Sequence, residues 1–100
     1  MAKSLSIQTG NLARTYKKSL SGMPQNIAKK AAQVADLICQ GGESYQRFQG
    51  KRLGVNRKVI AVKLGQKHRL LIADTDAGIV PWQCLSHESY NNIYMQISPN

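Results

Sequence analysis

The spacing of the apolar residues changes near residue 59, and this change limits the possible folds more than any other feature of the sequence. Upstream, apolar side chains recur every three or four positions, which is typical of amphipathic helices. Downstream they recur at every second position, which is typical of strands, through residues 59–64, 69–73 and 79–85. Because three consecutive strands joined by short loops form an antiparallel meander, we predict an α+β fold: a helical hairpin packed on one face of a small, mainly antiparallel sheet.

The upstream region is predicted to hold one strand and then the two helices of the hairpin. Apolar and polar residues alternate in residues 4–8, so a short first strand is expected there, followed by a turn at residues 9–11. This strand is expected to join the same sheet. Helical spacing then runs through residues 12–20 and again through residues 24–40, where a pair of glycines provides the stop. Residues 43–57 have no clean period and are interpreted as an irregular basic segment.

Alternation also assigns the two faces of the predicted sheet. The residues expected to point toward the helices, with Trp82 as a core residue, are Ile60, Val62, Leu64, Leu70, Ile72, Val80, Trp82 and Cys84. Matching Leu64 with Leu70 across the first hairpin requires an odd number of loop residues, so a loop of three or five residues is expected. Pro81 indicates an edge strand or a bulge. Residues 86–94 leave the sheet and are expected to form a short terminal helix.

The opposite face carries polar side chains that converge near one end of the sheet. They are Lys63, Arg69, Gln83 and His87, which share a face by alternation. Arginine supplies a planar fork of donors, lysine a point charge and histidine a proton near neutral pH, so a phosphate is a matching ligand. The same cations would also keep an exposed sheet face soluble, and His87 would then cap a helix or bond to a carbonyl.

The charge balance favours an anionic partner. Fourteen Lys and Arg residues stand against five acidic residues, which gives a net charge of +9 and a pI near 10.0. Such a pI is typical of nucleic-acid-binding domains. Every Lys and Arg lies between Lys3 and Arg69, an asymmetry that a uniformly solubilising surface does not need. A solvated basic surface and an acidic protein partner are the alternatives.

The length of 100 residues suits a single domain over residues 1–100. Cys39 and Cys84 stand apart in apolar surroundings, which predicts free buried thiols in the reducing cytoplasm. Their spacing is not that of a metal site, and neither a metal nor a cofactor is expected. No stretch approaches the roughly 18 apolar residues that a membrane-spanning helix needs.

The string KVIAVKLGQKHRLLIADTDAGIVPWQCLSHESYNNIY, at residues 58–94, resembles the RelE/ParE superfamily of small bacterial toxins. The resemblance is clear over roughly the second half of the chain, whereas the first half agrees in architecture alone. Members have a strand, a helical hairpin and then an antiparallel meander. The resemblance therefore implies a β-α-α-β-β-β order, the order that the spacing of the residues also predicts.

The resemblance also implies that the chain is the toxin of a type II toxin–antitoxin system. In members that cut messenger RNA, usually on the ribosome, a basic position on the second strand corresponds to Lys63. The arginine of an aromatic-Arg-Leu pattern corresponds to Arg69 in KHRLLI. The segment SHESY is similar to the one in which several members carry a catalytic histidine, here His87, followed by an aromatic residue, here Tyr90.

The expected activity is thus that of a metal-independent endoribonuclease that inhibits translation. His87 would act as acid or base, Arg69 and Lys63 would clamp the phosphate, and Tyr90 would stack on or orient the substrate. The residues expected to bind along the nucleic acid are Lys51, Arg52, Arg57, Lys58, Lys67 and Gln83. The expected partners are a cognate antitoxin and messenger RNA, with or without the ribosome.

Departures from the pattern of the nuclease members keep two alternatives open. Some members carry a second lysine two residues before the first, and this chain has Ala61 there. The ParE branch of the superfamily lacks a nuclease site and instead poisons DNA gyrase. A gyrase inhibitor without catalysis and a non-toxic nucleic-acid-binding module are therefore the alternative functions.

Overall fold

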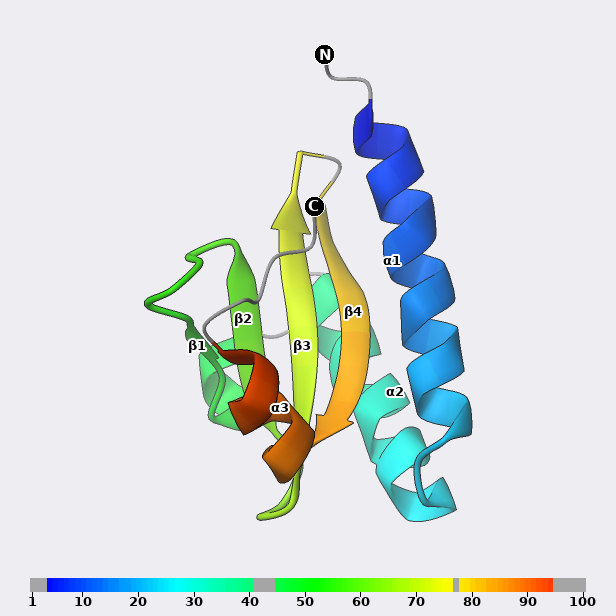
Figure 1. Ribbon diagram of the computed structural model, residues 1–100, viewed down its shortest axis with the longest axis vertical. Coiled ribbons are helices and arrows are strands. Elements are labelled where there is room, and N and C mark those ends of the chain that lie inside the picture. The colour runs from blue at the N-terminus through cyan, green and yellow to red at the C-terminus, as the bar shows by residue number, and fades with distance from the viewer. Residues whose placement is uncertain (1–3, 41–44, 77, 95–100) are drawn as a thin grey trace.

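A computed structural model describes residues 4–40, 45–76 and 78–94 of the chain (Figure 1). Two helices come first, a short 3-10 helix and four strands follow, and a third helix ends the described part. Their bounds are α1 Ser4–Ser21, α2 Gln25–Cys39, η1 Tyr45–Phe48, β1 Lys51–Arg52, β2 Val59–Lys63, β3 His68–Thr75, β4 Gly78–Ser86 and α3 His87–Ile93. Among these described residues, no helix is both long enough and apolar enough to cross a membrane.

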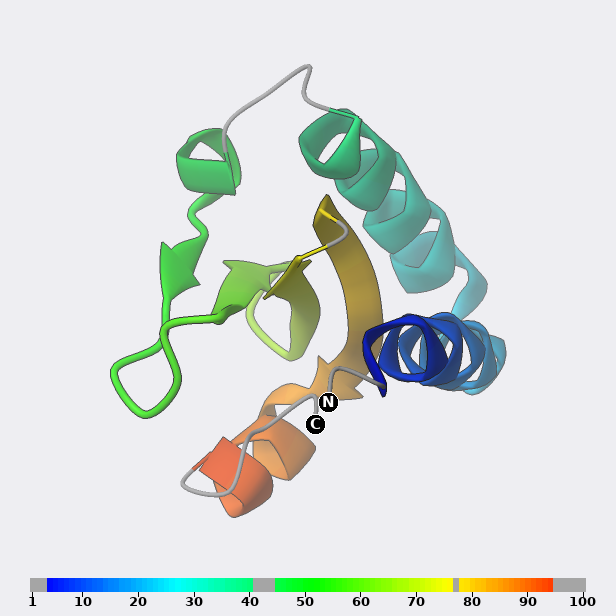
Figure 2. The ribbon, with the colours of Figure 1, turned by 90° about the horizontal axis from the view of Figure 1, so that it is seen from above.

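The strands form one antiparallel sheet in the order β1-β2-β3-β4, so each strand pairs with its neighbour in the chain. The view from above shows α2 on one face of the sheet and α3 on the other, with α1 beside the edge strand β4 (Figure 2). The predicted α+β fold, with a helical hairpin, an antiparallel meander and a short terminal helix, is confirmed.

The first strand predicted at residues 4–8 is wrong, because these residues begin α1. The predicted turn at residues 9–11 is also helical. Extending an existing helix by one residue is far easier than starting a new element, so the strong helical pattern from Leu12 onward extends upstream through a short, weak alternation. The strand that completes the sheet is β1, which lies within the segment predicted to be irregular.

Helix α1 covers the outer edge of β4. Its Ser19 Oγ accepts a hydrogen bond of 2.9 Å from the backbone N–H of Cys84 and donates one of 2.8 Å to the carbonyl of Tyr16. An unpaired strand edge is a template for aggregation, and a covering helix removes that hazard. Helix α2 then ends at Cys39, and the glycine pair predicted as its stop lies outside the described residues.

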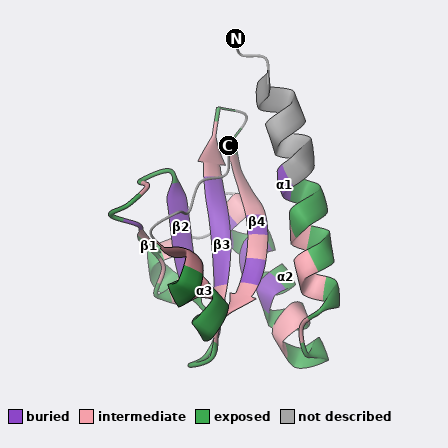
Figure 3. Ribbon diagram, viewed as in Figure 1, coloured by how far each residue is buried: buried purple, intermediate pink, exposed green. Residues whose placement is uncertain are grey.

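Two apolar clusters fill the space on either side of the sheet, and β2 is buried along most of its length and β3 along its middle (Figure 3). The first cluster joins α2 to the sheet through Ala31, Val34, Ala35, Ile38, Ile60, Val62, Leu64, Leu70, Ile72 and Cys84. The second lies on the α3 face. Its buried members are Leu12, Leu53, Val59, Ala61, Leu71, Ala73 and Trp82, with Tyr90, Ile93 and Tyr94 packed against them.

The β2–β3 hairpin has a three-residue loop, one of the two predicted lengths. The backbone N–H of Leu64 donates to the carbonyl of His68 at 3.0 Å, which closes the loop over residues 65–67. Val62 therefore pairs with Leu70, and the predicted pairing of Leu64 with Leu70 is wrong by two residues. A shift of two residues preserves the faces, so the assignment of side chains on β2 and β3 is confirmed.

A bulge in β4 changes the faces of its first half. Leu71 pairs with Gln83 and Ile72 with Pro81, which leaves Trp82 as an extra residue. Cys84 lies in the first cluster as predicted, but Trp82 and Val80 lie in the second. The prediction that all three face the hairpin helices is therefore wrong for two of them. Trp82 is a core residue, as expected, and Pro81 did indicate both an edge strand and a bulge.

The same bulge moves two more residues of β4. Strict alternation along residues 79–85 would place Ile79 and Pro81 on the face that carries the cations. Ile79 instead packs against the first cluster, and Pro81 pairs with Ile72, which belongs to that cluster. Strict alternation fails here because the extra residue shifts the parity of everything that precedes it in the strand.

Candidate nucleic-acid interface

Three cations from three strands share the α3 face of the sheet. Lys63 and Arg69 are direct partners in the β2–β3 ladder, and Lys51 is the direct partner of Ala61, two residues before Lys63. Directly paired residues point to the same face, as do residues two apart in a strand. Like charges placed directly opposite each other destabilise a sheet. An anion bound between Lys63 and Arg69 would remove that repulsion.

Arg69 is held in place by its neighbours. Its Nη1 donates a hydrogen bond of 2.9 Å to the carbonyl of His68, and its Cζ lies 6.0 Å from the centre of the Tyr90 ring. The second contact has the geometry of a cation–π interaction. Lys63 by contrast is exposed. The pair therefore combines one oriented guanidinium with one adaptable ammonium.

Tyr90 reaches this position from α3. The Oγ of Ser86 caps the helix by accepting a hydrogen bond of 3.1 Å from the backbone N–H of Ser89. The Tyr90 ring meets Tyr94 edge to face at 5.7 Å between centroids. Burial raises the pKa of the Tyr90 phenol, Tyr94 raises it further and Arg69 opposes the shift. The phenol thus stays protonated at neutral pH and is a hydrogen-bond donor.

A pocket of about 340 Å³ opens between these side chains, and we call it the sheet pocket. Its lining residues are Gln49, Lys51, Ala61, Lys63, Arg69 and Tyr90. None of these described lining residues is acidic, and three are cations. A concave site with this composition is suited to a phosphate group, which guanidinium and ammonium donors bind through charge-assisted hydrogen bonds.

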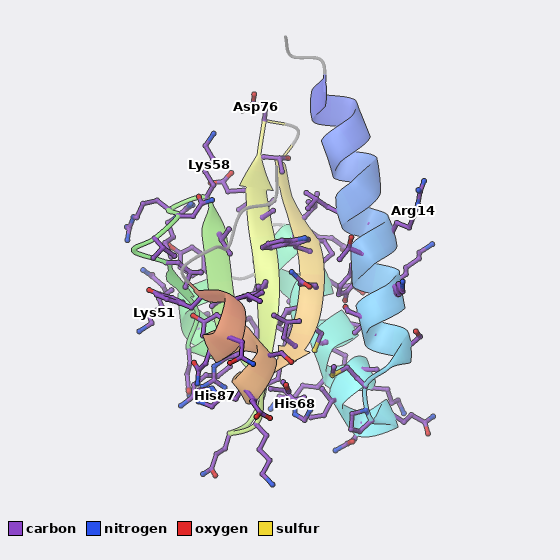
Figure 4. The ribbon with its side chains drawn as sticks, in the orientation of Figure 1. Arg14, Lys51, Lys58, His68, Asp76 and His87 are labelled. Carbon is purple, nitrogen blue, oxygen red and sulfur yellow. The ribbon has the colours of Figure 1, made fainter. Side chains whose placement is uncertain are left out.

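His87 lies at the first position of α3 and does not line the sheet pocket. Its ring is exposed, and its Nε2 lies 3.2 Å from Nδ2 of Asn91. Its backbone N–H donates to the carbonyl of Lys67 at 2.7 Å, which ties α3 to the β2–β3 loop. Figure 4 places His87 and His68 at the same end of the sheet.

The residues expected to bind along the nucleic acid separate into two groups. Lys51 lines the sheet pocket, Gln83 shares its face through pairing with Leu71, and Lys67 lies in the β2–β3 loop. Lys58 lies at the opposite end of the sheet from His87 (Figure 4). The exposed Arg57 precedes it in the chain.

Arg52 has structural contacts of its own. Its Nη1 lies 3.0 Å from Oδ2 of Asp74 and donates to the carbonyl of Arg57 at 2.9 Å, and its Cζ lies 5.7 Å from the centre of the Tyr45 ring. A hydrogen bond with Tyr45, then the one with Asp74, raises its pKa above the usual value. These contacts tie β1 to the body of the domain and so hold the neighbouring Lys51 in place.

Sequence reasoning missed Gln49, which lines the sheet pocket from the turn between η1 and β1. Its φ of 62° is left-handed, a conformation that favours glycine. Gly50 follows, and a Cβ there would lie 2.8 Å from the carbonyl oxygen of Tyr45. Gly50 is the signal in the sequence that indicates a turn here, but it does not say which side chain enters a pocket.

The fold and the order of its elements are consistent with the small toxins of the RelE/ParE type. A family model described as the ParE-like toxin domain matches residues 25–92, from the start of α2 into the last turn of α3. The chain belongs to this family. It is the toxin of a toxin–antitoxin system, and its partner is a cognate antitoxin. A search of curated proteins found no match, and a search of solved structures found none.

Proposed function

We propose that this toxin binds messenger RNA in the sheet pocket, cleaves it and so inhibits translation. The observation that carries the proposal is the direct pairing of Lys63 with Arg69 inside a pocket that Lys51 and Tyr90 complete. Two directly opposed cations lower the stability of the sheet unless an anion lies between them. A phosphodiester has the charge and the oxygen geometry that this pair recognises.

Cleavage by the neighbouring 2′-hydroxyl assigns a step to each group. A base removes the 2′ proton, the 2′ oxygen attacks phosphorus, and the 5′ oxygen leaves with a proton and frees a 2′,3′-cyclic phosphate. Arg69 and Lys63 hold the phosphate and stabilise the charge of the phosphorane. The protonated phenol of Tyr90, beneath Arg69, orients the phosphate or the adjacent base.

His87 is proposed as the acid or base of this reaction. It lies three residues before Tyr90 on α3, so the two side chains are neighbours on the helix surface. The imidazole ring is exposed and contacts the side-chain amide of Asn91. A rotation of the His87 side chain would break this contact. Lys51, Lys67 and Gln83 would bind the flanking nucleotides, with Arg52, Arg57 and Lys58 contributing to the positive potential beyond them.

Induced expression in a bacterium tests the proposal, with growth and the 5′ ends of cellular messages as readouts. The wild type should arrest growth and create new message ends, whereas Arg69→Ala and His87→Ala should do neither. Arg14→Ala is the matched control, because Arg14 is an exposed arginine on α1, away from the sheet pocket (Figure 4). Wild-type growth arrest with intact messages would contradict cleavage.

A second candidate function is inhibition of DNA gyrase without catalysis. The family model that matches is ParE-like, and the imidazole of His87 lies outside the sheet pocket. Both observations favour binding without cleavage. Growth arrest with intact messages, an SOS response and filamentous cells would support this function. Arrest with cut messages and no SOS response would exclude it.

A further inference from the structure

A second basic pocket adjoins the sheet pocket around the end of β2. It has a volume of about 350 Å³ and opens between α2, η1 and the β2–β3 loop, so we call it the helix pocket. Gln49 and Lys63 line both pockets. The two cavities are therefore neighbours, with the side chains of these residues at their boundary.

The chemistry of the helix pocket matches that of a nucleotide. Lys30 from α2, Arg47 from η1 and Lys63 from β2 place three cations around it, and none of its described lining residues is acidic. The half-buried Phe48 contributes an aromatic ring to the lining. Cations that follow a backbone, together with an aromatic ring on which a base stacks, are the features by which proteins bind single-stranded nucleic acid.

The backbone of Gln49 provides an independent observation. Its left-handed φ of 62° is strained for a residue with a side chain and free of strain for glycine. Stability alone would therefore favour glycine at this position. The chain instead carries an amide that lines both pockets, and an amide can donate to and accept from the edge of a base.

We propose that the helix pocket binds the nucleotide adjacent to the phosphate held by Lys63 and Arg69. Single-stranded RNA then passes from the α3 face of the sheet, past Lys63 and Gln49, to α2. The phosphate of this nucleotide contacts Lys30 and Arg47, its base stacks on Phe48, and Gln49 bonds to the base edge. The inference rests on the proposed function, because it extends the same RNA site by one nucleotide.

The test measures the affinity of uncleavable RNA oligomers, with a 2′-O-methyl group on every ribose, by fluorescence anisotropy. A dinucleotide occupies the sheet pocket, and a tetranucleotide also reaches the helix pocket. The wild type should bind the tetranucleotide at least about tenfold more tightly, since stacking and phosphate contacts both add to affinity. Lys30→Gln and Phe48→Leu should lose most of this gain and keep the dinucleotide affinity. Lys29→Gln is the matched control, because Lys29 is the exposed neighbour of Lys30 and does not line the pocket.

Gln49→Gly separates a binding role of Gln49 from a purely structural one, because the two readouts should change in opposite directions. The variant should raise the midpoint of thermal unfolding, because the left-handed strain is gone, and should lower the gain from the dinucleotide to the tetranucleotide. An unchanged gain in Gln49→Gly, Lys30→Gln and Phe48→Leu would overturn the inference. The same applies if Lys30→Gln weakens only antitoxin binding, which would assign the pocket to the antitoxin.

Failure of the proposed function gives a different result. In that case the wild type binds neither oligomer and leaves messages intact. If the wild type binds the dinucleotide and cuts RNA while the affinity gain is absent, only the helix pocket is excluded.

Discussion

The repulsion between Lys63 and Arg69 predicts that removing one charge makes the fold more stable and the toxin inactive. Lys63→Gln is the better perturbation, because Lys63 is exposed whereas Arg69 also bonds to the carbonyl of His68 and contacts Tyr90. Glutamine keeps most of the side-chain length and hydrogen bonding while it removes the positive charge. The expected outcome is therefore opposite in sign for stability and for function, as for many functional sites.

The magnitude follows from the ladder. Directly opposed residues have Cβ atoms about 5 Å apart. Two unit charges about 6 Å apart in water repel by about 0.7 kcal/mol. At physiological ionic strength, screening reduces this to roughly 0.3 kcal/mol. Lys63→Gln should accordingly raise the free energy of unfolding by about 0.5 kcal/mol at low salt, which is about 2–4 °C in the unfolding midpoint of a domain this size.

Chemical denaturation at low and at high salt measures this effect, with Arg69→Gln and the double variant completing a double-mutant cycle. The coupling energy should be repulsive at low salt and vanish at high salt. The same Lys63→Gln protein should lose affinity for RNA and fail to arrest growth. Destabilisation by Lys63→Gln at both salt concentrations, or full retention of RNA affinity, would refute the reasoning.

Three further predictions concern the scaffold of the site. Ser19→Ala should lower the free energy of unfolding by about 1 kcal/mol, because the Cys84 N–H on the β4 edge loses its acceptor. Gly50→Ala should lower it by about 1–3 kcal/mol, since the new Cβ would lie too close to the Tyr45 carbonyl, whereas Gly54→Ala meets nothing within 4 Å and is the control. Burial raises the pKa of the Cys84 thiol from its ordinary 9.0 to about 11, so its stabilising effect is complete below pH 9.0 and is lost as the pH rises through about 11. The free energy of unfolding of Cys84→Val, measured by denaturation, should therefore fall less steeply with pH over that alkaline range.

Much of the fold could be predicted because the strongest patterns in the sequence are long. The stripe of α2 and the alternation of β2 and β3 each extend over several residues, and their apolar side chains pack together in the first cluster. Even the error in the β2–β3 register left the placement of Lys63 and Arg69 intact, since it was an even shift. That these two cations share a face was thus accessible from alternation alone, whereas their direct pairing was not.

The parts of the fold that could not be predicted are segments too short to show a sequence period. A strand as short as β1 has no period, and its place in the sheet follows from the Arg52 contacts and from the close approach at Gly50. The alternation in residues 4–8 was too short to compete with the helix that follows.

The bulge in β4 explains why the cationic face is a pocket and not an open surface. Without the extra residue, Trp82 would follow Cys84 into the first cluster, and the second cluster would lose its largest buried side chain. With it, Trp82 joins the second cluster, against which Tyr90, Ile93 and Tyr94 pack. That packing holds α3 over the sheet and sets the Tyr90 ring beneath the guanidinium of Arg69. The geometry of the sheet pocket therefore depends on the bulge at Trp82 as well as on the residues that line the pocket.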